Sequence, residues 1–166
     1  MKIELATGSD DEQRAAAVFE SLVAEYAPTI DRFLYTDTVV LDTKSEAPYS
    51  HPVLTISPPY VVGPRLVALT VLVHENMHWA SRVLPGCAAM RDEARRRWPD
   101  PPAAADGGAH NALSTWLHVC VCSLELAAMW NADVYEVVAE RGDKILESIA
   151  SVSDEAAALV EWSRHG

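Results

Sequence analysis

The sequence is poor in basic residues, long apolar runs and signal-like features, and each shortage excludes a class of protein. It has 13 lysines and arginines against 24 acidic residues, which gives a net charge of −11. An acidic surface repels phosphate backbones and anionic headgroups, so we expect no nucleic-acid partner and no membrane partner. The longest apolar run, residues 66–73, is far shorter than the ~20 residues of a membrane span. The N-terminal segment is acidic, unlike a signal peptide, and we expect a cytoplasmic protein.

Cysteine is also scarce, with three residues at positions 87, 120 and 122. The number is odd, and Cys120 and Cys122 are too close along a helical segment to pair with each other. We therefore expect reduced, buried thiols, as in an intracellular protein.

Apolar residues, in contrast, make up 49% of the 166 residues. A chain of this length and composition can bury a sizeable core, so we expect one domain over residues 1–166. A helix is expected over 9–26, because Ser9 and Glu12 are spaced as a capping box, with Pro28 closing it. Segments 33–42 and 51–57 are rich in β-branched residues and predict a small antiparallel sheet.

The second half of the sequence predicts mainly helices. Residues 64–84 form a strongly apolar segment typical of a buried helix, which Pro85 and Gly86 should end. Residues 85–108 should be irregular apart from a short charged helix, followed by a long helix over 109–140 and amphipathic helices in the tail. The expected fold class is therefore α+β, with a mostly helical C-terminal half.

The buried helix carries two histidines, His74 and His78, with Glu75 directly after the first. Side chains four residues apart lie on one face of a helix, so both imidazoles can reach one metal ion. Glu75 lies one step around the helix, where it can take a proton from a metal-bound water.

This His74-Glu75-Asn76-Met77-His78 segment resembles the HExxH motif of the zincin metallopeptidases. The resemblance implies a zincin-like fold, a Zn²⁺ cofactor and hydrolysis of peptide bonds in a peptide or protein substrate, with Glu75 as general base. It also implies that an edge strand, here 51–57, pairs with an extended substrate.

A catalytic zinc site needs a third protein ligand, which the motif does not supply. Within the apolar segment 110–133, His118 and Glu125 are seven residues apart and share a helix face, with Cys122 between them. The run from Glu125 to Ala128 resembles the Glu-x-x-Ala segment of the gluzincins, which implies Glu125 as the preferred third ligand. His118 is the alternative, in which case Glu125 orients a zinc-bound histidine.

Two further hypotheses remain open. His110 near the start of the same helix is a candidate for stabilising the oxyanion of a tetrahedral intermediate, or else a solvated residue. The chain as a whole is alternatively a non-enzymatic helical interaction module, in which the same polar groups form a structural metal site or a buried network.

Overall fold

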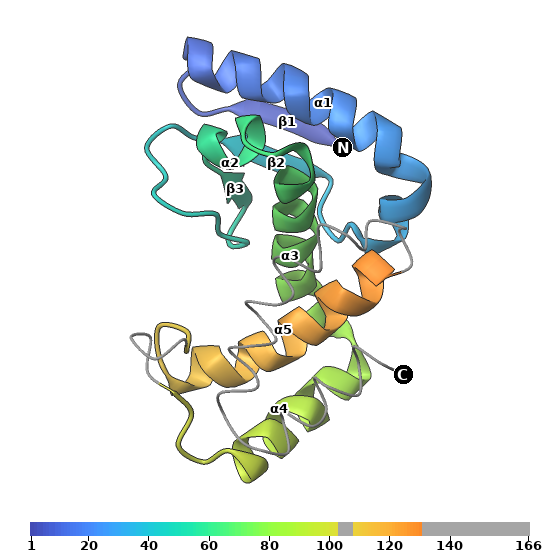
Figure 1. The fold of residues 1–166 in the computed structure, drawn as a ribbon, viewed down its shortest axis with the longest axis vertical. Helices are drawn as coiled ribbons and strands as arrows, with labels where there is room; N and C mark the ends of the chain where they lie inside the picture. Colours follow the sequence, from blue (N-terminus) through green and yellow to red (C-terminus); the bar gives the residue numbers. More distant parts are fainter. Residues whose placement is uncertain (103–107, 131–166) are drawn as a thin grey trace.

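The computed structural model describes residues 1–102 and 108–130 and has an α+β architecture, which confirms the expected class (Figure 1). A small sheet and one long helix lie at the N-terminal end, and the central helix extends from there to two further helices. The elements are β1 (Lys2–Leu5), α1 (Asp10–Ile30), the 3-10 helix η1 (Asp31–Phe33), β2 (Thr38–Leu41), β3 (Leu54–Ile56), α2 (Pro58–Val62), α3 (Arg65–Val83), α4 (Pro85–Arg97) and α5 (Ala112–Trp130).

The sheet has three parallel strands in the order β1-β2-β3, so the prediction of an antiparallel sheet was wrong. The reason lies in how the strands are connected. Helix α1 returns the chain between β1 and β2, and residues 42–53 return it between β2 and β3, so each strand starts from the same end. Strand β1 was not predicted because its four residues are largely exposed at an edge of the sheet, where the apolar pattern is weak.

Two prolines have roles other than those expected. Pro28 lies inside α1, which continues to Ile30, so the prediction that it closes the helix was wrong. Its missing N–H costs one bond in the last turn, where the loss matters least. Helix α3 ends at Val83, as Pro85 and Gly86 predicted, but Pro85 also begins α4, because a first-turn position needs no N–H donor. Residues 85–97 are therefore helical where mostly irregular chain was expected.

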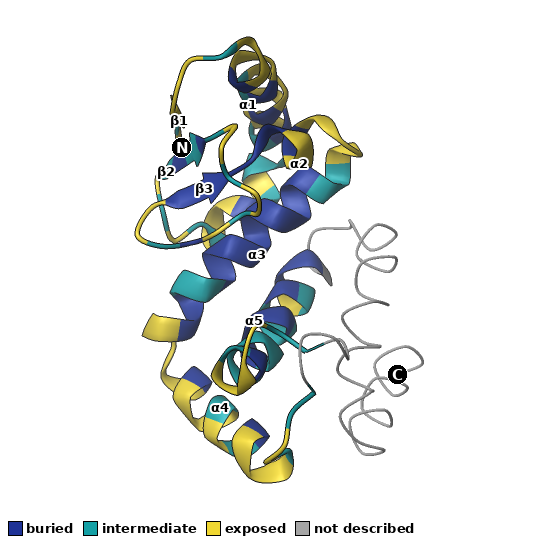
Figure 2. Cartoon of the chain, turned by 90° about the vertical axis from the view of Figure 1, so that its left-hand side faces the viewer, coloured by how far each residue is buried: buried dark blue, intermediate teal, exposed yellow. Residues whose placement is uncertain are grey.

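Helix α3 is the central element of the described structure, as its apolar sequence predicted. Every residue from Ala68 to Met77 is buried, and the helix contacts α1, α2, α4 and α5 (Figure 2). The hydrophobic core joins the inner face of α1, the middle strand and the first half of α3 in one cluster, to which α5 adds Val121 and Met129. The predicted extension of the last long helix to 140 and the tail helices fall outside the described residues. The expectation of one domain over residues 1–166 stays a prediction.

Within the part of the chain that the structure describes, α5 is the one helix long and apolar enough to cross a membrane by length and composition. The core helix of a soluble protein passes the same test, and several α5 residues are buried here against other helices. The expectation of no membrane partner therefore stays a prediction.

A buried carboxylate, Glu12, connects the start of α1 to the loop that precedes this helix and to the loop that follows β2. Its side chain is 0% exposed and accepts hydrogen bonds from the backbone N–H groups of Thr7, Gly8 and Thr43 at 2.8–3.1 Å. Ser9 caps the helix, accepting from the Glu12 N–H at 3.4 Å. Burial raises the pKa of Glu12, but the hydrogen bonds from Thr43, Thr7 and Gly8 together outweigh it and hold this pKa at about 2.

We expect Glu12→Gln to lower the free energy of unfolding at pH 7 by roughly 2 kcal/mol, because an amide replaces one acceptor oxygen by a donor that faces other donors. The folded pKa of about 2 lies below the ordinary value of 4.5. The carboxylate's contribution is thus complete above pH 4.5 and is lost as the pH falls towards 2. Urea denaturation across this pH range measures both effects. The exposed Glu20→Gln serves as the control, and equal stability of the two variants would contradict the prediction.

Candidate metal centre

Three histidines converge where α3 contacts α5. His74 and His78 come from α3, and His118 comes from the facing side of α5; the ring centroids are 5.1 Å, 5.0 Å and 5.7 Å apart for the pairs 74–78, 78–118 and 74–118. One ring nitrogen from each lies within 4.8 Å of the others, so the three can hold a metal ion. Nitrogens around a tetrahedral zinc with bonds of 2.0–2.1 Å are ~3.3 Å apart, so binding requires only a modest closing of the rings.

Helical spacing explains how α5 presents its ligands. His118, Cys122 and Glu125 follow one another at intervals of four and three residues, which places them on one face. That face lies against α3, whose own pair His74 and His78 has the same four-residue spacing. The candidate metal centre therefore forms where these two helical faces meet.

Two of the rings are held by a hydrogen bond at Nδ1. His118 Nδ1–H donates to the backbone carbonyl of Ser114 at 2.7 Å, because a carbonyl can only accept. His74 Nδ1 lies 2.7 Å from Glu125 Oε2, within hydrogen-bond distance. Such bonds fix the tautomer and leave Nε2 of each ring with a lone pair for a metal, as in most metal-binding histidines.

The surroundings keep two of the rings neutral. Burial, together with the charges of His74, His118, His51 and Arg82, lowers the pKa of His78 to about 3. Burial likewise lowers the pKa of His118, against the opposing effect of its bond to Ser114. A histidine binds metal in its neutral form, so both rings are ready to bind at neutral pH.

A second group of possible ligands adjoins the first. One ligand atom each from His74, Cys122 and Glu125 lies within 4.8 Å of the others, and all three residues are buried. His74 is common to both groups, whereas His78 belongs only to the three-histidine group. Glu125 contacts a ring nitrogen of His74, as an orienting residue would, and it is also a possible ligand in the second group. The choice between Glu125 and His118 as third ligand stays a prediction.

The other predicted site residues lie as follows. Glu75 is buried on α3 with 7% of its surface exposed, next to His74 in the chain. His110 is exposed just before α5 and belongs to neither ligand group. The roles of Glu75 as general base and of His110 in transition-state stabilisation stay predictions.

Asn76, inside the motif, has a role that the sequence analysis missed. Its side chain is fully buried, and its Oδ1 accepts from the backbone N–H groups of Tyr35 and Thr36 at 2.7 Å and 3.2 Å. Its Nδ2 donates to the Leu72 carbonyl at 2.9 Å. A polar residue in the middle of a buried apolar helix was the available signal, since such a group needs partners. Asn76 thus fixes the segment before β2 to the motif helix.

His51 and Trp79 were missed as well. Trp79 Nε1–H donates to the Ser50 carbonyl at 3.1 Å, and the His51 ring packs edge-on against Trp79 with centroids 4.2 Å apart. The Nε2 atom of His51 is buried, and the described residues offer it no hydrogen-bond partner. A histidine beside a proline in a strand-like segment carried no clear signal of this position. Trp79 therefore joins the loop before β3 to the motif helix.

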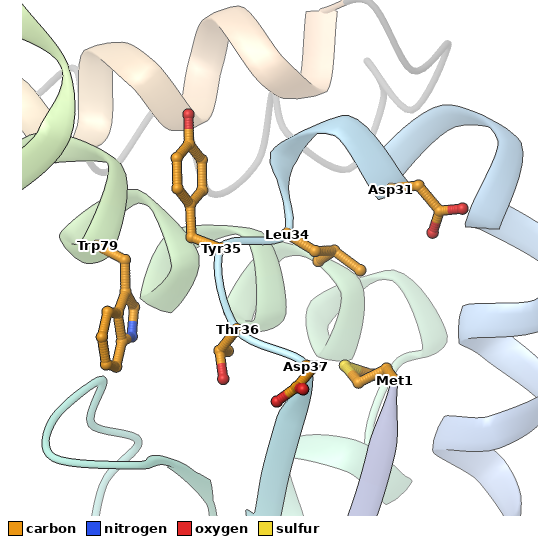
Figure 3. A pocket seen from close by; sticks show the side chains of 7 residues that line it. All are labelled: Met1, Asp31, Leu34, Tyr35, Thr36, Asp37 and Trp79. Carbon is orange, nitrogen blue, oxygen red and sulfur yellow. The ribbon is translucent and has the colours of Figure 1, made fainter.

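A pocket of about 550 Å³ lies beside Trp79 (Figure 3). Its wall is formed by side chains of the segment between α1 and β2, including Tyr35 and Thr36, with Met1 at one end. Because Asn76 holds this segment, the wall is attached to the same helix that carries His74 and His78.

The outer edge of β3 is already occupied where the resemblance implied substrate pairing. Thr55 exchanges two backbone hydrogen bonds with Tyr49, at 3.0 Å and 2.8 Å. A substrate strand cannot pair with Thr55 unless it displaces this contact.

The geometry predicts an order of zinc affinities. We expect His118→Ala to weaken zinc binding by more than about 100-fold and Glu125→Gln by about 10- to 100-fold, because removing a ligand costs more than removing its orienting partner. Competition with a chromophoric chelator at fixed pH measures both. His110→Ala is the matched control on the same helix and should bind as the unaltered protein does. A larger loss of zinc affinity in Glu125→Gln than in His118→Ala would indicate that Glu125 is the third ligand.

Comparison with known proteins adds no relative to these observations. No family model matches the chain, and no match was found among the curated proteins or among the solved structures. The zincin resemblance therefore stands on the motif and on the residues that surround it.

Proposed function

We propose that this protein is a zinc-dependent hydrolase of peptide or other amide bonds. The observation that carries the proposal is the convergence of His74, His78 and His118, with the Nδ1 atoms of His74 and His118 each engaged in a hydrogen bond. Three imidazoles in a partly buried site are a suitable ligand set for zinc, and they leave a fourth position open.

Glu75 and Glu125 would have different roles in this reaction. Zinc in such a site supplies Lewis-acid chemistry and lowers the pKa of a water ligand to about 7. Glu75 takes a proton from the attacking water as general base and delivers it to the leaving amine. Glu125 holds the His74 ring in the orientation and tautomer that ligation requires.

The zincin-like fold and the substrate class belong to the same proposal. Support comes from the motif on a buried helix and from ligands on a later helix that packs against it. The substrate is a peptide or protein, and the pocket beside Trp79, whose neighbour in the chain is His78, could receive one of its side chains. The proposal does not include pairing of the substrate with β3 at Thr55, because Tyr49 already bonds to the backbone there. A cytoplasmic location is proposed on the composition alone.

One observation favours the non-enzymatic alternative. The buried pair formed by His74 and Glu125, with a 2.7 Å hydrogen bond, satisfies both groups without a metal. A structural metal site or a buried polar network that holds α3 against α5 would need the same contact.

Peptide hydrolysis by metal-loaded protein separates these functions. We expect zinc-dependent cleavage within a fluorogenic peptide library, abolished by a chelator. Glu75→Gln should lower kcat by about 100-fold or more at unchanged zinc content, because the general base is lost while the ligands remain. Glu20→Gln, on an exposed face of α1, is the control and should keep full activity.

Two results would contradict the proposal that the protein is a hydrolase. A protein that binds one zinc tightly but cleaves nothing in the library supports a structural site. A protein that binds no zinc and keeps its stability supports a buried polar network.

A further inference from the structure

We propose that the metal centre has a second, inner binding position, formed by His74, Cys122 and Glu125, which takes a thiophilic divalent cation. The proposal shares His74 with the proposed hydrolytic site and so rests on that centre being a metal site, but it does not depend on hydrolysis. It adds Cys122 as a ligand and assigns Glu125 a second role.

The three residues form a compact and deeply buried set. Their ligand atoms lie within 4.8 Å of one another, and their exposed fractions are 9% for His74, 7% for Cys122 and 3% for Glu125. The three-histidine position is more open, because His78 and His118 are only partly buried. The two positions therefore differ in depth along the contact of α3 with α5.

The donor atoms of the two positions also differ in charge. The outer position offers three neutral nitrogens, so a divalent cation there keeps its full charge. The inner position offers a thiolate and a carboxylate, which together neutralise a divalent cation. Burying an uncompensated charge is costly, so the deeper position is the one whose ligands compensate the ion. Sulfur, nitrogen and carboxylate oxygen are all ligands of zinc, and a thiolate favours softer ions such as Cd²⁺.

The shared ring makes the two positions exclusive. His74 Nδ1 lies 2.7 Å from Glu125 Oε2, so this nitrogen faces the inner position. A cation bound there through Nδ1 leaves the ring proton on Nε2, the nitrogen that the outer position needs. Inner binding also uses Cys122 as a thiolate, whereas outer binding uses no sulfur ligand.

Cadmium titration of the metal-free full chain tests the proposal. We expect a thiolate-to-cadmium charge-transfer absorption that saturates at one equivalent of Cd²⁺. Cys122→Ser should abolish the absorption and weaken Cd²⁺ binding by at least tenfold. Cys120→Ser, two residues away on the same helix, is the matched control and should retain both.

The contrary outcomes are distinct. Absorption that persists in Cys122→Ser, or that disappears equally in Cys120→Ser, would overturn the inner position. If Cys122→Ser does not fold, the absorption of the unaltered protein decides the matter, and absence of a thiolate-to-cadmium band overturns the proposal. None of these readouts measures hydrolysis, so a zinc-loaded protein that lacks peptidase activity would refute the proposed function and leave the inner position standing.

Discussion

The contact between His74 and Glu125 is the interaction on which the arrangement of the candidate metal centre depends. It joins α3 to α5 with 2.7 Å between Nδ1 and Oε2, and both residues are buried. Apolar contacts alone permit helices to rotate or slide against each other, whereas a buried hydrogen bond between two polar side chains has few satisfied geometries. That geometry sets the facing of His118 and Cys122 and so the identity of the possible ligands.

The sequence was sufficient to predict the parts of this centre that depend on one helix at a time. The four-residue spacing of His74 and His78 predicted that both side chains share a helix face, and the seven-residue spacing of His118 and Glu125 predicted the same for the later helix. Which of these two completes the site depends on how α3 crosses α5, a long-range contact that no local pattern encodes. The same limit explains the sheet: the strand-like segments were visible, but their direction depended on β1, whose few largely exposed residues gave no apolar signal.

Helix α3 both carries two of the candidate metal ligands and holds neighbouring segments of the chain in place. One side presents the histidines, while Asn76 and Trp79 attach the segment before β2 and the loop before β3. The pocket wall formed by the segment before β2 is thus attached, through Asn76, to the helix that carries the two motif histidines. A shift of this helix would carry ligands and pocket wall together, so their relative geometry is preserved.

The contact of Tyr49 with Thr55 has a consequence for how copies of the protein meet. A sheet with two open edges invites pairing with a second chain and, by repetition, fibrous aggregation. Here the chain folds back on β3 and uses the Thr55 backbone groups itself. The opposite edge, β1, is only four residues long and carries the charged Lys2 and Glu4. The sheet is therefore protected at both edges against edge-to-edge polymerisation, by a turn of its own backbone on one side and by charge and short length on the other.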